Sequence, residues 1–282
     1  MKILDSNIKC LIQLALSEDI GRGDITSDAL VEDILTGKAV IVAKDVGILA
    51  GLEVAKTVFQ MVNPKIIFSS LIEDGEKIKK GDKVALIQGK VKSILSAERT
   101  VLNFLQRLSG IATLTSKYVE KVKGTKVKIL DTRKTTPGLR ILEKYAVKTG
   151  GGENHRMGLF DMILIKDNHI KAAGGISEAI KIAKSKYGKK TIEVEVRNLN
   201  EVKEAIESKP DWIMLDNMKI EDMKKAVRII RSTNSHIKIE ASGGVNLGNV
   251  RKIALTKVDF ISVGALTHSA PALDLSLILV ES

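Results

Sequence analysis

From residue 126 onward, short apolar runs alternate with longer amphipathic segments. The apolar runs predict strands at 127–130, 162–165, 191–196, 212–215, 237–240 and 260–263. The segments at 139–148, 177–187, 199–208, 219–230 and 249–255 carry apolar residues at helical spacing. This alternation predicts parallel strands joined by right-handed crossovers, either closed as a barrel or open as a doubly wound sheet. No G-x-G-x-x-G follows the first strand, so we expect a barrel with fewer than the usual eight strands.

The first hundred residues have a different pattern, which predicts a separate α+β domain. We expect helices over 6–19 and around 52–62, and strands within 38–45 and 81–90. We expect a further helix over 96–121, with an interruption near Gly110, to link this domain to the barrel. No low-complexity linker separates the two parts.

Composition narrows the classes of partner and location. The net charge of +11 suggests an anionic partner, but aromatic residues make up only 3% of the chain, which disfavours single-strand nucleic-acid binding. Cys10 is the one cysteine, so no intrachain disulfide forms and a reducing compartment fits. No run approaches the ~18 apolar residues that a membrane span needs. We therefore expect a cytoplasmic protein that binds neither nucleic acid nor membranes.

Polar residues or glycines follow every predicted strand of the barrel. Because active sites of parallel barrels lie at the carboxyl ends of the strands, these residues predict one polar cavity. They are Asp131, Arg133, Lys134, Lys166, Asp167, Glu193, Glu195, Asp216, Asn217, Glu240, Ser242, Gly243, Gly244, Gly264 and Ala265.

Each motif also has a simpler structural interpretation. The stretch DTRK at 131–134 is by itself more typical of a salt-bridged surface loop. The glycine run that precedes His155 and Arg156 usually marks a turn. A histidine such as His169, beside a buried strand, is more often structural than catalytic.

Lys166 follows an apolar strand near the expected barrel axis, where an unpaired ammonium group is costly. Its partner is Asp167, Glu195 or a ligand, and a structural ion pair is an equal alternative. Glu195 and Asp216 end adjacent strands and would suit a divalent metal or sugar hydroxyls, or they pair with lysines.

The segment ASGGV at 241–245 precedes a helix that we expect to begin near Asn246. Its backbone N–H groups and the helix dipole would suit a phosphate group. The segment 262–265 ends the next strand, and barrel phosphate sites commonly use the last two strand ends. Together, the cations, the acids and this loop suit a carboxylated substrate beside a phosphorylated sugar.

Several long motifs resemble the quinolinate phosphoribosyltransferase family. They are EDIGRGDITSD near the start, SAERTVLNFLQRLSGIAT (96–113), DTRKTTPGLR (131–140), GGGENHRMGLFDMILIKDNH (150–169), EVEV (193–196), LDN (215–217), EASGGV (240–245) and ISVGALTHSAPALDLSL (261–277). The resemblance implies an N-terminal α/β sandwich domain (1–108) and an incomplete, six- or seven-stranded parallel α/β barrel (109–270). It also implies a C-terminal segment (271–282) that returns to the first domain.

The resemblance further implies a reaction in NAD biosynthesis. Quinolinate and phosphoribosyl pyrophosphate would give nicotinate mononucleotide, pyrophosphate and CO2, with Mg²⁺ as cofactor. A related phosphoribosyltransferase that acts on nicotinate or another carboxylated ring without decarboxylation is the alternative. A homodimer or higher even oligomer is implied, in which Arg99 reaches into the neighbour's pocket.

The resemblance also implies roles for single residues. Quinolinate would be bound by Thr132, Arg133, Lys134, His155, Arg156 and Lys166. Glu195 and Asp216 would face the ribose and its metal, either directly or through the sugar. The 5′-phosphate would be bound by Ser242, Gly243, Gly244, Val263, Gly264 and Ala265. The residues closest to the chemistry would be Lys134, Lys166, Glu195 and Asp216.

Overall fold

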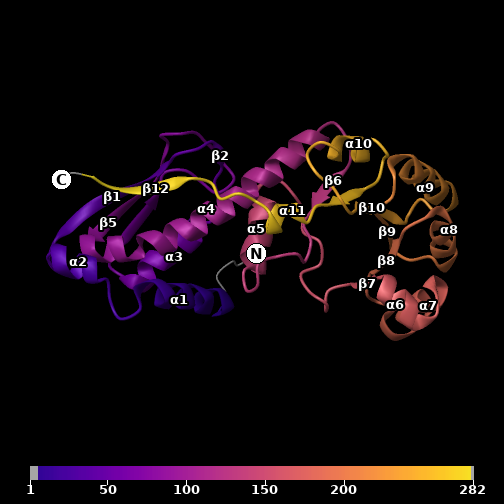
Figure 1. The fold of residues 1–282 in the computed structure, drawn as a ribbon, viewed down its shortest axis with the longest axis horizontal. Helices are drawn as coiled ribbons and strands as arrows, with labels where there is room; N and C mark the ends of the chain where they lie inside the picture. The colour runs from indigo at the N-terminus through magenta and orange to yellow at the C-terminus, as the bar shows by residue number, and fades with distance from the viewer. Residues whose placement is uncertain (1–5, 281–282) are drawn as a thin grey trace. The chain divides into compact units, whose positions relative to one another are not determined.

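The computed structural model describes residues 6–280, which divide into two compact units (Figure 1). The first unit contains the described residues up to 116, residues 136–151 and the described residues from 270 onward. The second unit contains residues 117–135 and 152–269. Among residues 6–280, no helix combines the length and the apolar character needed to cross a membrane.

The first unit is built on a four-stranded antiparallel sheet. In spatial order its strands are β12 (Leu275–Val280), β1 (Thr36–Ala43), β5 (Lys83–Lys90) and β3 (Ile67–Ser70). A two-stranded sheet adds β2 (Gly47–Ile48) and β4 (Lys77–Ile78). The helices are α1 (Ser6–Ile20), α2 (Ile25–Leu30), α3 (Leu52–Val62), α4 (Val91–Val122), which continues past the end of this unit at residue 116, and α5 (Arg140–Thr149).

Two segments distant in sequence complete the first unit. β12 pairs antiparallel with β1, from Ala43 opposite Leu275 to Lys38 opposite Val280. α5 is tied to α4 by an ion pair of 2.7 Å between the Arg107 guanidinium and the fully buried Glu143 carboxylate. The compact units divide after residue 116 and again between residues 269 and 270, and residues 136–151 belong to the first unit. The predicted domain boundaries stay a prediction.

The expected interruption of α4 near Gly110 is wrong, because the helix runs unbroken through that position. Gly110 lies where a Cβ atom would overlap the carbonyl oxygen of Pro271. The glycine therefore allows the C-terminal segment to approach the helix backbone closely, and does not break the helix.

Residues 117–269 contain a six-stranded parallel sheet. In spatial order its strands are β6 (Lys128–Leu130), β11 (Phe260–Ser262), β10 (Lys238–Ser242), β9 (Trp212–Asp216), β8 (Ile192–Val196) and β7 (Ile163–Ile165). The first strand in sequence, β6, lies beside the last, β11, and not beside β7. This order is that of a barrel left open between β6 and β7, and it confirms the predicted fold class.

The helices of the second unit follow its strands. They are α6 (Asp167–Ala173), α7 (Ile176–Tyr187), α8 (Leu199–Ser208), α9 (Ile220–Thr233), α10 (Val250–Ala254) and α11 (Ala265–His268). Figure 1 shows α7, α8 and α9 side by side along the outside of the sheet.

Strand alternation separates an apolar outer face from a polar inner one. In β8, the outward-facing Ile192, Val194 and Val196 are at most 2% exposed. Glu193 and Glu195 alternate with them and point the other way, because successive side chains of a strand lie on opposite faces. The inner face therefore carries charge toward the ends of the strands.

We predict that Gly110→Ala destabilises the protein. In an ordinary helix this change stabilises by about 1 kcal/mol. Here the new Cβ meets the Pro271 carbonyl, so we expect a loss of about 1–3 kcal/mol in the free energy of unfolding, measured by urea denaturation. Gly248→Ala is the control, since its nearest neighbour is an exposed asparagine side chain at 3.2 Å. A stabilised Gly110→Ala protein would contradict the packing role.

Candidate active site

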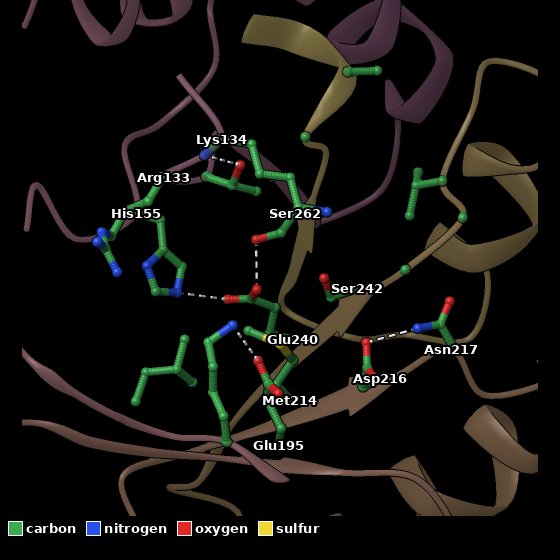
Figure 2. Close-up of a pocket in the computed structure, with 18 of the residues that line it drawn as sticks. Arg133, Lys134, His155, Glu195, Met214, Asp216, Asn217, Glu240, Ser242 and Ser262 are labelled. Atoms are coloured by element: carbon green, nitrogen blue, oxygen red, sulfur yellow. Dashed lines mark hydrogen bonds and ion pairs between the residues drawn. The ribbon is translucent and has the colours of Figure 1, made fainter. Parts of the chain in front are cut away.

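A cavity of about 650 Å³ opens at the carboxyl ends of the parallel strands. Most of the predicted site residues line it: Thr132, Arg133, Lys134, His155, Arg156, Lys166, Glu195, Asp216, Ser242, Gly243, Gly244, Gly264 and Ala265. Asn217 and Glu240, which the sequence placed at strand ends, also line it, as do Val245 and Ser262 from the two predicted phosphate segments. Further lining residues that the sequence analysis did not single out are Leu164, Met214 and His268. Figure 2 shows these side chains converging from the strands and from the loops that follow them.

Two predicted site residues are not among those that line the cavity. Arg99 is exposed on α4, in the first unit. Val263 is 1% exposed, and its N–H donates to the carbonyl of Leu130 at 2.9 Å. Neither its side chain nor its amide is available to a ligand. Val263 therefore affects the cavity only by placing its neighbours Ser262 and Gly264.

Two arginines make one side of the cavity strongly cationic. Arg156 is 8% exposed, and one of its guanidinium nitrogens donates to the carbonyl of Met162 at 3.1 Å. Burial, and next the charge of Arg133, lower the pKa of Arg156. The Nε of Arg133 is buried and has no hydrogen-bond partner among the described residues. Two like charges and an unmatched donor together require an anion.

Lys166 pairs with Glu195, one of the three partners that the sequence left open. Its Nζ lies 3.1 Å from a Glu195 carboxylate oxygen, and its side chain remains 47% exposed to the cavity. The backbone N–H of Lys166 donates to Nδ1 of His169 at the start of α6. His169 therefore orients the backbone of Lys166 and is not among the cavity-lining residues, as its structural interpretation predicted.

Asp216 is held at the cavity by its neighbours. The side-chain amide of Asn217 donates to it at 2.9 Å, and Arg197 lies 3.6 Å away. Asn217 has a φ of +53°, and its amide lies where a Cβ at Gly243 would be. Glycine at 243 is thus required by the close approach of Asn217, and Asp216 is oriented as a result.

The loop after β10 offers backbone amides, but the predicted helix start near Asn246 is wrong. α10 begins at Val250 and is only five residues long. Asn246 instead forms a turn, in which its side-chain oxygen accepts from the amides of Gly248 and Asn249. Gly243 and Gly244 both have positive φ, a backbone conformation that favours glycine.

Beneath the cavity lies a buried acid pair, Glu193 and Glu240, each 0% exposed. Burial, and next the negative charge of Glu240, raise the pKa of Glu193 to about 8. Ser262 donates to Glu240 at 2.5 Å (Figure 2). The sequence placed both acids at strand ends but gave them no role. The sequence feature that could have revealed Glu193 is the alternation of side chains along a strand, which puts Glu193 on the same face as Glu195.

His155 binds the acid pair from above. Its Nε2 lies 3.0 Å from Glu193 and 3.3 Å from Glu240. Burial lowers the pKa of His155, but hydrogen bonds to the two glutamates outweigh burial and raise it to about 10. The backbone N–H of Arg156 opposes that rise, because it donates to Nδ1 at 2.8 Å and a protonated Nδ1 cannot accept.

His268 is a cavity residue that strand-end reasoning missed. It follows β11 at the end of the single helical turn α11, and Nδ1 lies 2.6 Å from the Ser269 hydroxyl. The sequence feature that could have identified His268 is its position one helical turn after Gly264, which places both residues on the same side of that turn.

Comparison with known proteins assigns both parts of the chain. Residues 24–109 match the quinolinate phosphoribosyl transferase N-terminal domain, and residues 111–278 match the C-terminal domain of the same family. A probable nicotinate-nucleotide pyrophosphorylase [carboxylating] from Synechocystis is 46% identical over 96% of this chain and 92% of its own. A quinolinate phosphoribosyltransferase [decarboxylating] from Nicotiana glauca is 45% identical over 96% of this chain and 82% of its own.

A solved structure agrees with these matches. The nicotinate-nucleotide pyrophosphorylase from Francisella tularensis superposes with a TM-score of 0.93 at 45% identity, over 97% of this chain and 96% of that one. The chain belongs to the quinolinate phosphoribosyltransferase family.

Proposed function

We propose that this quinolinate phosphoribosyltransferase binds quinolinate against Arg133 and Arg156 and binds phosphoribosyl pyrophosphate against the opposite side of the cavity. The products are nicotinate mononucleotide, pyrophosphate and CO2. The observation that carries the assignment is the buried Arg133 Nε without a partner beside a second guanidinium. A ring with two adjacent carboxylates supplies two charges to this pair, and its acceptors satisfy donors that are otherwise costly to bury.

The sugar substrate is proposed to lie along β9, β10 and β11. Glu195 and Asp216 face the ribose, and the loop of Ser242, Gly243 and Gly244, with Gly264 and Ala265, binds the 5′-phosphate through backbone amides. The Val263 amide is excluded from this role because it is used in strand pairing.

Mg²⁺ is the proposed cofactor, and the acids present suit it. Glu195 and Asp216 are two carboxylates at the cavity, with side chains 13% and 19% exposed. Among the described residues they belong to no group of three potential metal ligands. Mg²⁺ typically uses one or two carboxylates together with substrate phosphates and water. When bound, the ion would neutralise charge on the leaving pyrophosphate.

The chain's own groups contribute position and electrostatics to the reaction. The arginines orient the ring so that its nitrogen attacks C1 of the ribose, whose bond to pyrophosphate breaks with the electron pair leaving on oxygen. Glu195 and Asp216 stabilise the positive charge that develops at the sugar, and Lys134 and Lys166 offset charge on the anionic groups. The alkylated ring nitrogen then stabilises the electron pair left at C2 when CO2 departs, and C2 takes up a proton. No covalent enzyme intermediate is needed.

A homodimer or higher even oligomer with shared sites is part of the proposal. Arg99 is exposed on α4 and belongs to the SAERT motif that carries the resemblance. We propose that it enters the cavity of a second copy and adds a further cation to the quinolinate side.

A cytoplasmic location completes the proposal and rests on the single cysteine. Relatives from Nicotiana tabacum and Arabidopsis thaliana are named mitochondrial and chloroplastic, so location differs within the family. Fractionation of the source cells tests it.

We predict that Arg156→Ala raises the KM for quinolinate by about 30- to 150-fold, because a charge-assisted hydrogen bond worth about 2–3 kcal/mol is lost. The KM for phosphoribosyl pyrophosphate should change by less than about threefold, since that substrate contacts other groups. Steady-state kinetics with each substrate varied in turn measures both. Arg228→Ala, an exposed arginine on α9, is the matched control. Equal losses for both substrates would show that Arg156 is misassigned.

Decarboxylation distinguishes this reaction from the nicotinate alternative. We predict one CO2 released for each pyrophosphate formed from quinolinate, and no turnover of nicotinate. Radiolabelled carboxyl groups and a coupled pyrophosphate assay give the two rates. Turnover of nicotinate alone would defeat the proposed substrate.

Site sharing can be tested by mixing two inactive variants. Arg99→Ala and Lys134→Ala proteins, dissociated and reassociated, should recover about a quarter of wild-type activity, because half of the dimers are hybrids with one intact site each. Each variant treated alone is the control. Hybrids that form, as seen with differently tagged chains, and yet remain inactive would refute the shared site.

A further inference from the structure

The segment that carries His155 and Arg156 has almost no secondary structure of its own. Residues 152–162 cross from α5 to β7, and their one ladder contact is an isolated bridge between Glu153 and Leu130. A binding side chain must be held within about 0.5 Å of its working position. Because a loop lacks a hydrogen-bond ladder to do this, side-chain contacts to the rigid strands must fix it.

His155 makes those contacts from three atoms. Its backbone N–H donates to the Asp131 carboxylate at 2.9 Å, and its Nε2 faces Glu193 and Glu240. Its Nδ1 accepts the backbone N–H of Arg156 at 2.8 Å. A backbone amide can only donate, so Nδ1 carries no proton and the ring proton is on Nε2, directed at the acids. Both ring nitrogens are therefore engaged within the protein.

Glu240 connects the loop that carries His155 to the parallel sheet. Its Oε1 accepts from the Ser262 hydroxyl of β11. Its Oε2 lies 3.3 Å from His155 Nε2, while the hydrogen bond of that nitrogen goes to Glu193 Oε2 at 3.0 Å. Glu240 is itself on β10 and fully buried, so its carboxylate has little freedom to rotate. Figure 2 shows Ser262 and His155 approaching the two oxygens of the Glu240 carboxylate from different directions.

We propose that Glu240 is a positioning residue for quinolinate, an inference that rests on the proposed function. Held by Ser262, Glu240 confines the imidazole of His155 together with Glu193, which takes the Nε2 hydrogen bond. The imidazole fixes the backbone of Arg156 and so directs the guanidinium into the cavity. His155 then acts through Arg156, and its ring nitrogens do not bind the substrate carboxylate.

Kinetics of Glu240 variants test the proposal. Glu240→Ala should raise the KM for quinolinate about 10- to 100-fold by misplacing Arg156, and leave the KM for phosphoribosyl pyrophosphate within about twofold. Glu240→Gln should restore most of the affinity, because its amide can accept from His155 and donate to the Ser262 oxygen. Ser262→Ala should cost about fivefold in the same direction. A parallel rise in both KM values, or no recovery with glutamine, would overturn the positioning role.

Matched controls exclude a general effect on folding. Glu221→Gln and Ser232→Ala change the same residue types on α9, where Glu221 pairs with Lys224 and Ser232 bonds only to its own helix. Both should leave the kinetics of each substrate unchanged. A quinolinate defect of similar size in either control would show that the Glu240 effect is not local.

A double-mutant cycle tests whether Glu240 acts through His155. In a His155→Ala protein, the further change Glu240→Ala should alter the KM for quinolinate by less than about twofold, because the shared path is already broken. Additive losses would place Glu240 on a separate path and overturn the proposal.

The proton position provides a readout that does not depend on activity. In protein with ¹⁵N-labelled histidine, the His155 ring, identified among the four histidines by its loss in His155→Ala, should be protonated at Nε2 only. A proton on Nδ1 would overturn the positioning role, because Nδ1 could then not accept from the Arg156 amide. The potential ligand atoms of His155, Glu193 and Glu240 lie within 4.8 Å of one another, which is close enough to hold a metal ion. If the three residues instead position Arg156, elemental analysis of the wild-type protein and of Glu240→Ala should find the same metal content. One equivalent of metal that is lost in Glu240→Ala would show that the three residues form a metal site, and it would overturn the positioning role.

Different results would contradict the proposed function and the positioning role of Glu240. An inactive protein with the expected Nε2 proton would defeat the proposed function, and with it any role for Glu240 in quinolinate binding. An active enzyme whose Glu240→Ala variant binds quinolinate normally would defeat the positioning role alone.

Discussion

The cost of burying charge at the ends of parallel strands constrains the whole site. Glu193 and Glu240 are completely buried on the inner face of the sheet, where an unmatched carboxylate is strongly destabilising. His155 Nε2 lies at hydrogen-bond distance from Glu193 Oε2, and Ser262 donates to Glu240 Oε1. The second oxygen of each acid, Glu193 Oε1 and Glu240 Oε2, has no hydrogen-bond partner among the described residues. On the outer face of the same strands, Val194 and Ala241 are fully buried and apolar, so the core under the helices provides the stability that the inner face lacks.

The order of the strands sorts the charges around the cavity. Arg133 and Lys134 follow β6, Lys166 follows β7, and the segment with Arg156 runs between them. β6 and β7 are the two edges of the sheet, so the cations gather around the opening of the barrel. The acids and the glycine loops follow the strands from β8 to β11. One parallel topology thus places the cations on one side of the cavity and the acids and glycine loops on the other.

The sequence predicted features that depend on local periodicity and missed features that depend on tertiary contacts. All six parallel strands and α3, α7, α8 and α9 follow from apolar spacing. α6 was not predicted, because its first turn depends on the His169 ring accepting from Lys166. The pairing of β12 with β1 joins residues more than 200 positions apart, which no local pattern reveals.

The site shows the same division. Strand-end reasoning placed the cations and acids in one region, because the ends of parallel strands meet at one edge. It could not identify the contact between His155 and Glu240, since that contact depends on the register of two strands and on the course of an irregular loop.

The protein's own acids and a carboxylated substrate would compete for the cations of the cavity. This competition would explain why the enzyme prefers a substrate with two carboxylates over one with a single carboxylate. Lys166 is already paired with Glu195, whereas Arg133 retains an unmatched Nε. In the proposed binding mode, a monoacid would satisfy one of the two guanidinium groups and would leave the other donor buried without a partner. That omission costs about 1–3 kcal/mol, or roughly 5- to 150-fold in affinity. Selectivity for a diacid therefore needs no group that repels nicotinate, because the unmatched arginine discriminates against it.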